Sequence, residues 1–241
     1  MAYKTGILPA LALAAGCAST PVEQPSETIT LPYVTSFSDN APGDAVPNGW
    51  RLWTLSRFKK ATQYQLVDND GHTVVKAHAQ ASASGLVHPL KLDPGAYPLL
   101  QWQWKTTALI ATADNTLKHT EDSPVRVVVS FDGDIDSLPL DDRMFFDNIR
   151  LLTGQQLPYA TLMYIWENRA ARNTIIPSRH TSRIKMIVVE SGRDKVGAWQ
   201  NVTRNVYDDY RRAFGGPPGT ITSVGIMTDT DNTGENVHAY Y

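Results

Sequence analysis

Hydrophobic and polar residues alternate along short segments from Tyr33 onward. In residues 100–105, Leu100, Trp102 and Trp104 share one parity, and polar residues occupy the other. Because successive side chains of a strand point to opposite faces, this segment predicts a strand with a core face and a wet face. Similar strands are predicted at 63–67, 73–77, 125–131, 160–166, 184–190 and 224–230.

Turn and helix signals lie between these strands. Residues 68–71 (DNDG) predict a tight hairpin turn, because Asn and Gly tolerate positive φ. Helices are predicted at 142–152 and 206–214, the second with an apolar stripe and with Asn205 as its N-cap.

Together these patterns predict a mainly β fold, an antiparallel β-sandwich of jelly-roll (galactose-binding-like) type with one or two short helices. The likeness to galactose-binding-like domains is one of architecture alone. The chain has 42% hydrophobic and 19% charged residues, which is typical of a folded globular protein. No repeat or second composition boundary interrupts 33–241, so we expect one domain there.

The N-terminal residues follow a different pattern. Residues 1–16 combine Lys4, a short apolar stretch and small residues before Cys17, which is the layout of an export signal. The stretch 13–17 (LAAGC) resembles the bacterial lipobox. This resemblance implies a lipoprotein signal peptide at 1–16 and lipidation of Cys17; the alternative is a stray cysteine in an ordinary cleaved signal.

Residues 17–32 are polar and rich in proline, which predicts a flexible tether. Ala18 follows the cysteine, and by resemblance to Gram-negative lipoproteins this implies transport to the outer membrane. We expect a membrane-anchored lipoprotein on the periplasmic side, whose N-terminal lipid contacts the membrane. The net charge of -2 provides no overall positive field, so nucleic acid is not an expected partner.

An Asp-rich segment near the C-terminal end suggests a metal site. Asp229, Asp231, Thr233 and Glu235 place oxygen atoms at alternate positions around Gly234, as calcium loops do. The match to an EF-hand is partial, because its twelfth position falls on Tyr240. The sequence therefore leaves two interpretations open, a calcium site and an Asp/Asn/Gly turn.

Glu190 ends the alternation Ile184-Met186-Val188, which places its carboxylate on the same face of the strand. If that face is buried, a cation must compensate the charge, and Arg143, Arg183 or Arg204 could do so. A structural ion pair is one interpretation. The other is a ligand-binding carboxylate with Trp166 or Tyr164 nearby.

Tryptophan is frequent, and aromatic faces stack on sugars in many binding modules. Trp102 and Trp104 share the parity of Leu100 and are expected in the core, whereas Trp53 and Trp199 have polar neighbours and are candidate platforms. A glycosidase needs two carboxylates, and Glu167 with Glu190 or Asp229 with Glu235 could form such a pair. The six histidines show no metal or triad spacing.

Several blocks as a set resemble the bacterial family called domain of unknown function 3047. They lie at 49–51, 81–86, 102–105, 162–166, 187–192, 204–211 (RNVYDDYR) and 227–235 (MTDTDNTGE). The resemblance runs from about Phe37 to the end and implies a secreted or periplasmic domain without an assigned biochemical role.

We therefore expect an envelope lipoprotein that is a noncatalytic binding module for a glycan or another cell-envelope component. The alternatives are an envelope polysaccharide hydrolase with a carboxylate pair, and a structural or assembly lipoprotein that binds a protein partner.

Overall fold

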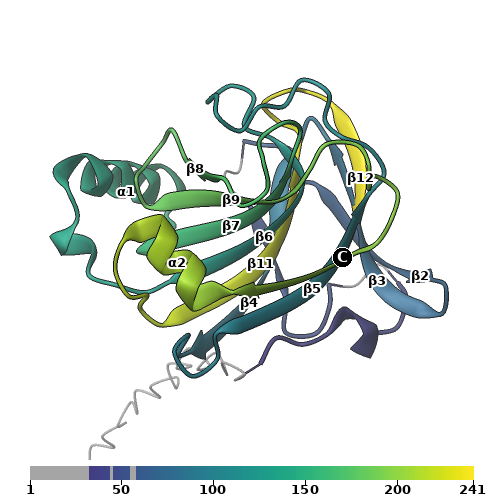
Figure 1. The fold of residues 1–241 in the computed structure, drawn as a ribbon, viewed down its shortest axis with the longest axis horizontal. Coiled ribbons are helices and arrows are strands. Elements are labelled where there is room, and N and C mark those ends of the chain that lie inside the picture. Colours follow the sequence, from purple (N-terminus) through teal and green to yellow (C-terminus); the bar gives the residue numbers. More distant parts are fainter. Residues whose placement is uncertain (1–32, 44–45, 55–57) are drawn as a thin grey trace, which may run out of the picture.

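Two β-sheets face each other in the computed structural model, which describes residues 33–43, 46–54 and 58–241 (Figure 1). The larger sheet contains β1 (Arg51–Thr54), β4 (Ala83–Leu92), β11 (Ile221–Asp229), β6 (Ser123–Phe131), β7 (Ala160–Glu167), β9 (Ile184–Ser191) and β8 (Ile175–Pro177), in that spatial order. The smaller sheet contains β10 (Gln200–Asn205), β5 (Leu99–Thr106), β12 (Asn236–Tyr240), β3 (His72–Gln80) and β2 (Gln63–Asn69). The helices are α1 (Leu140–Thr153) and α2 (Val206–Phe214), and η1 (Phe37–Asp39) and η2 (Ile135–Ser137) are 3-10 turns. The predicted β-sandwich is confirmed.

The N-terminal predictions fall on a part of the chain that lies outside the described residues. These are the signal peptide at 1–16, the lipidation site Cys17 and the tether at 17–32. Among the described residues, no helix has both the length and the apolar character needed to cross a membrane.

Hydrophobic alternation located most of the sandwich correctly. The seven predicted strands correspond to β2, β3, β5, β6, β7, β9 and β11. Between β2 and β3, Asp70 and Gly71 both have positive φ, at 57° and 82°, as a two-residue hairpin turn requires. Helix α2 has the predicted bounds, and the side chain of Asn205 accepts a hydrogen bond from the backbone N–H of Asp208. Strands β1, β4, β8, β10 and β12 were not predicted.

One pair of strands departs from the predicted antiparallel arrangement. Strand β9 pairs with β7 in parallel, with Met163 opposite Met186. The chain leaves β7, returns through β8 and then inserts β9 between the two, so that β8 and β9 are antiparallel. The alternation in 184–190 gives the spacing of side chains along the strand but not the direction of its neighbour, which is why the sequence did not show this pair.

The main core lies between the two sheets. Leu100, Trp102 and Trp104 of β5 pack into it, as the parity of that strand predicted, and Trp104 is 0% exposed. A second apolar cluster of Ile165, Ile176, Met186 and Val188 forms apart from this core, at β7, β8 and β9. The larger sheet is therefore buried on both faces there.

Helix α1 is attached to the sandwich by a buried carboxylate. The side chain of Asp142 accepts hydrogen bonds from Thr181 Oγ1 at 2.6 Å and from the backbone N–H of Ser182 at 2.9 Å. Burial alone raises the pKa of a carboxyl group, but the donors on Ser182 and Thr181 outweigh it and hold the pKa of Asp142 below 3.8.

We expect Asp142→Asn to lower the free energy of unfolding by about 1–2 kcal/mol at pH 7, since it weakens hydrogen bonds to a charged acceptor. The lowered pKa means that the carboxylate stabilises the fold above pH ~4 and that this contribution disappears as the pH falls through the folded-state pKa. The difference between wild type and variant should therefore stay constant above pH ~4 and shrink as the pH falls below it, as measured by urea denaturation. Asp141→Asn, at the exposed neighbouring position, is the matched control; an equal effect there would contradict the assignment.

Candidate functional site

The outer face of the smaller sheet is open to solvent. We call it the open face and define it by the outward positions of its five strands, all of which are exposed or half-buried. The inward positions of β5 pack into the core, so the alternate residues Gln101, Gln103 and Lys105 point outward. Residues that pair across neighbouring strands point to the same face of a sheet. The outward residues of the neighbouring strands therefore include Asn201, Thr203, Tyr240, His238, Lys76 and His78.

Three side chains form an aromatic and cationic cluster on the open face. Lys105 Nζ lies 4.9 Å from the centroid of the Trp199 ring and 4.6 Å from that of Tyr240. The two rings are 6.4 Å apart, edge to face. Lys105 Nζ also donates a hydrogen bond to Asn69 Oδ1 at 3.2 Å. Both rings are half-buried, so part of each remains accessible to a ligand.

Amide side chains lie beside this cluster in register across β5 and β10. Gln103 Nε2 donates to Asn201 Oδ1 at 2.6 Å, and Gln101 Nε2 donates to Thr203 Oγ1 at 3.4 Å. These four residues are exposed. Their remaining donors and acceptors can bind hydroxyl groups of a ligand without a change of backbone.

Two histidines extend the open face on the other side of Tyr240. The rings of His78 and His238 stack with centroids 4.2 Å apart and an angle of 21° between their planes. His78 Nε2 also lies 3.1 Å from Asn236 Oδ1. Partial burial, together with the neighbouring His78 and Lys76, lowers the pKa of His238 below 6.5. His238 is therefore mainly neutral at pH 7.

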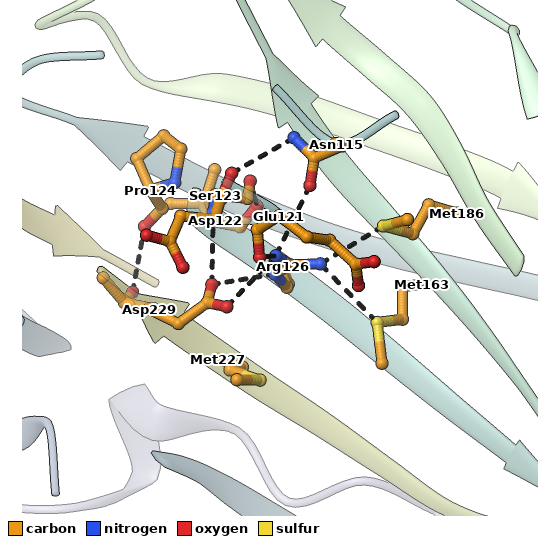
Figure 2. A network of polar contacts seen from close by, with 12 residues as sticks. Asn115, Glu121, Asp122, Ser123, Pro124, Arg126, Met163, Met186, Met227 and Asp229 are labelled. Atoms are coloured by element: carbon orange, nitrogen blue, oxygen red, sulfur yellow. Dashed lines mark hydrogen bonds and ion pairs between the residues drawn. The ribbon is translucent and has the colours of Figure 1, made fainter. Parts of the chain in front are cut away.

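Asp229, the first residue of the Asp-rich segment, belongs to a buried polar network at one end of the larger sheet (Figure 2). Arg126 is 2% exposed and binds Asp229 in a bidentate manner, with Nε at 2.8 Å from Oδ1 and Nη2 at 3.1 Å from Oδ2. Its Nη1 points to the sulfur atoms of Met163 and Met186, at 3.8 and 3.3 Å. Burial raises the pKa of Asp229 to about 7, although the charge of Arg126 opposes this shift.

The other carboxylates of this segment also have partners within the chain. Asp231 forms an ion pair with Lys59, and Glu235 accepts backbone hydrogen bonds from Ala111 and Thr112 at 2.8 and 2.9 Å. Thr233 donates its backbone N–H to buried Asp122 at 2.7 Å. Of the four predicted metal ligands, only Asp229 and Asp231 lie together, with Asp122, within 4.8 Å of one another.

The predicted ligand-binding residues Tyr164 and Arg204 do lie together, but Tyr164 is buried and Arg204 is half-buried and bound within the protein. Arg204 Nε and Nη2 donate to the carboxylate of Asp209 at 2.7 and 2.6 Å, and Tyr164 Oη donates to the same carboxylate at 3.1 Å. Burial, together with Asp209, raises the pKa of Tyr164 well above 10.0. Since these residues come from β10, α2 and β7, the cluster joins the two sheets to helix α2.

Other candidate residues are dispersed. Trp166 is 1% exposed and donates its ring N–H to the carbonyl of Gly192, so it is a core residue. Trp53 is half-buried on β1 and donates to Gln155 Oε1, and Arg143 is exposed on α1.

Glu190 is 6% exposed and pairs with Lys195, with 2.8 Å between Nζ and Oε2. The predicted arginine partner was therefore wrong. Arg204 is bound to Asp209, and Arg183 stacks on the rings of Tyr159 and Phe214.

Among the predicted ligand-binding residues, Trp199 is the one that the structure places beside the open face: it directly precedes β10, and its ring contacts Lys105 and Tyr240. Sequence reasoning missed Lys105, Tyr240 and Lys76. The alternation Asn236-His238-Tyr240 was a usable signal, because it marks a strand with a polar face.

Arg126→Met leaves the buried carboxylate of Asp229 without its cation, and we expect it to lower the free energy of unfolding by about 3–5 kcal/mol. The double variant Arg126→Met/Asp229→Asn removes both charges and keeps an acceptor for the backbone N–H of Ser123, which binds Asp229 Oδ1 at 3.2 Å. Urea denaturation should therefore show that the double variant regains at least half of the lost stability. Equal instability of the single and double variants would contradict this account.

Calcium binding at the Asp-rich segment stays a prediction to be tested. Arg126 and Lys59 already compensate the charges of Asp229 and Asp231, so of the two interpretations we expect the Asp/Asn/Gly turn and not the calcium site. The Tm of the protein in millimolar calcium should then equal its Tm in chelator. A rise of several degrees that Asp231→Asn abolishes would establish a calcium site instead.

Comparison with known proteins agrees with the resemblance seen in the sequence. No curated protein matches the chain. The family described as "Protein of unknown function (DUF3047)" matches residues 48–241, which include both sheets, the open face and the Arg126 network. The chain belongs to this family, DUF3047.

Proposed function

We propose that this protein is a noncatalytic module that binds a glycan of the bacterial cell envelope on its open face. The observation that carries the proposal is the cluster of Trp199, Lys105 and Tyr240 on an accessible sheet surface. Aromatic rings offer apolar faces to the C–H groups of a sugar, while neighbouring polar groups bind its hydroxyls.

The geometry of the open face suits an extended polymer. Neighbouring strands lie about 4.8 Å apart, so side chains on three adjacent strands form a row about 10 Å long. Lys105, Tyr240 and Lys76 occupy one such row on β5, β12 and β3. The exposed amides of Gln101 and Gln103 continue along β5. A chain of sugar rings can therefore contact aromatic and amide groups in succession.

Catalysis is less well supported, because the carboxylates of the two possible pairs are bound within the protein. Glu167 Oε2 accepts the backbone N–H of Ala170 at 2.5 Å, and Glu190 pairs with Lys195. In the other pair, Asp229 is held by Arg126 and Glu235 by Ala111 and Thr112. A glycosidase must keep one carboxyl group available to the sugar oxygen and the other to water or the anomeric carbon.

A protein partner is the second candidate, and helix α1 favours it. Leu140, Met144 and Leu151 are 62%, 54% and 85% exposed, and their spacing places them on one side of the helix. Such an apolar stripe is a common feature of contact surfaces. In Figure 1, α1 lies at the opposite end of the molecule from β2 and β3, so this stripe and the open face could be occupied together.

The location in the cell is part of the proposal. A signal peptide at 1–16, a lipid on Cys17 and a tether at 17–32 would hold the sandwich on the periplasmic side of the outer membrane. A module tethered there would meet the envelope polysaccharides that the open face fits.

Trp199→Ala and Tyr240→Ala should each weaken binding of the best ligand in a panel of soluble envelope polysaccharides by about 3- to 10-fold, since each variant removes an aromatic contact. Isothermal titration calorimetry measures the affinity, and thermal unfolding confirms that each variant is folded. Trp53→Ala removes the other predicted platform tryptophan, which lies in the larger sheet, and should leave the affinity unchanged. Absence of binding to every saccharide in the panel would contradict the proposed function.

A further inference from the structure

We infer that the glycan bound by the open face is anionic, with carboxylate or other acidic groups on its sugars. The inference rests on the proposed function and adds the ligand class. It follows from the arrangement of charge on the open face, which differs from the rest of the molecule.

The open face has cations but no acidic residue at its outward strand positions. Lys76 and Lys105 lie on it, while every other outward position of β2, β3, β5, β10 and β12 is uncharged or a histidine. The chain as a whole has a net charge of -2, with 24 acidic residues. Asp68 lies at an inward position near the end of β2, Asp70 lies in the β2–β3 turn, and Glu235 precedes β12, so none of these carboxylates occupies an outward strand position.

These two lysines have no carboxylate partner among the described residues. The ion pairs of that part of the chain use Lys59 and Lys195, together with Arg126, Arg150, Arg204 and Arg212. Lys105 is instead held over two aromatic rings and hydrogen-bonded to a neutral amide. Its charge therefore remains available to an anion.

The positions of the lysines match the aromatic platform. Lys105 lies opposite Tyr240 on one neighbouring strand and Lys76 lies opposite it on the other, so a lysine occupies the paired position on each side of Tyr240. Lys105 Nζ lies 4.6 Å from the centroid of the Tyr240 ring. A sugar stacked on Tyr240 brings its acidic substituent within reach of one lysine or the other. Charge-assisted hydrogen bonds of this kind are about twice as strong as neutral ones.

Polysaccharide fits this charge pattern better than the other polyanions. Phosphate backbones of nucleic acids need a larger positive field than two lysines supply. An anionic lipid surface needs apolar side chains that enter the bilayer, and the centre of the open face carries amides instead.

The test compares acidic polysaccharides with their carboxyl-reduced neutral forms, using the purified full-length chain and titration calorimetry. Polygalacturonate, alginate and hyaluronate are the acidic probes, and each reduced polymer keeps its backbone but loses its charge. We expect at least one acidic form to bind about 10-fold more tightly than its reduced form at low salt. Its affinity should fall several-fold between about 50 and 500 mM NaCl, as screening requires.

Lys76→Gln and Lys105→Gln should each weaken binding of the acidic polymer about 3- to 10-fold and weaken binding of the reduced polymer less, so that the ratio of the two affinities falls. Lys91→Gln changes an exposed lysine of β4 in the larger sheet and is the matched control, with unchanged affinity expected. Thermal unfolding of each variant verifies that it is folded.

Three outcomes would overturn the inference. Equal binding of acidic and reduced forms, or binding of neutral glycans alone, would leave the proposed function intact and exclude an anionic ligand. Tighter binding to vesicles of anionic phospholipid than to any saccharide would point to a membrane surface. Absence of binding to every saccharide, acidic or neutral, would refute the proposed function and this inference with it.

Discussion

The buried ion pair between Arg126 and Asp229 fixes the place where the chain crosses from one sheet to the other. Asp229 is the last residue of β11 in the larger sheet, and β12 begins in the smaller sheet at Asn236. Between them, buried Asp122 accepts the backbone N–H of Thr233, and Glu235 binds the segment 111–112. The course of the chain between β11 and β12 thus depends on carboxylates whose charges are compensated by groups of the protein itself.

This crossing determines what the open face presents. Strand β12 lies between β5 and β3, and its register sets Tyr240 beside Lys105 and Lys76. A shift of one residue would turn His238 and Tyr240 inward and expose Val237 and Ala239. The following residue secures the register: the hydroxyl of Tyr241 donates to the carbonyl of Met227 at 2.6 Å, and its backbone pairs with Val75. The position of the accessible cluster of Trp199, Lys105 and Tyr240 therefore depends on the buried network around Arg126 and Asp229.

The sequence correctly predicted those strands and helices that are determined by interactions between residues close together in the chain. The alternation in 100–105 and the Asn205 cap of α2 depend on neighbours within a few residues, and both were correct. Strand β4 was missed because Ser84, Gly85 and Pro89 are typical of turns. A Cβ at position 85 would lie 2.6 Å from the carbonyl oxygen of Ile226, so glycine is required there by the close approach of β11. That reason lies more than a hundred residues away in the chain.

The contrast between short-range patterns and long-range strand pairing also explains which residues of the candidate site were predicted and which were missed. Trp199 was predicted from its polar neighbours, but Lys105 and Tyr240 join it only through pairing between β5 and β12, which are separated by some 130 residues. Tyr164 and Trp166 were candidate ligand-binding residues in one of the two interpretations of Glu190, yet both belong to the core between the sheets. Their hydrogen-bonding groups serve α2 and the loop after β9 instead. Parity along one strand separates its two faces, but only pairing with distant strands decides which face is covered.

The form of the open face also limits the kind of ligand that it can bind. Small molecules are usually held in concave pockets of roughly 300–1,000 Å³, whereas the open face is the outer surface of a sheet. A sheet surface with fixed register encloses a ligand poorly, so each contact contributes little and affinity must come from many contacts repeated along the ligand. Polymers supply that repetition. On the proposed function, Lys76, Lys105 and Tyr240 would select which repeating unit is bound, since their charges and ring favour a sugar that carries an acidic group.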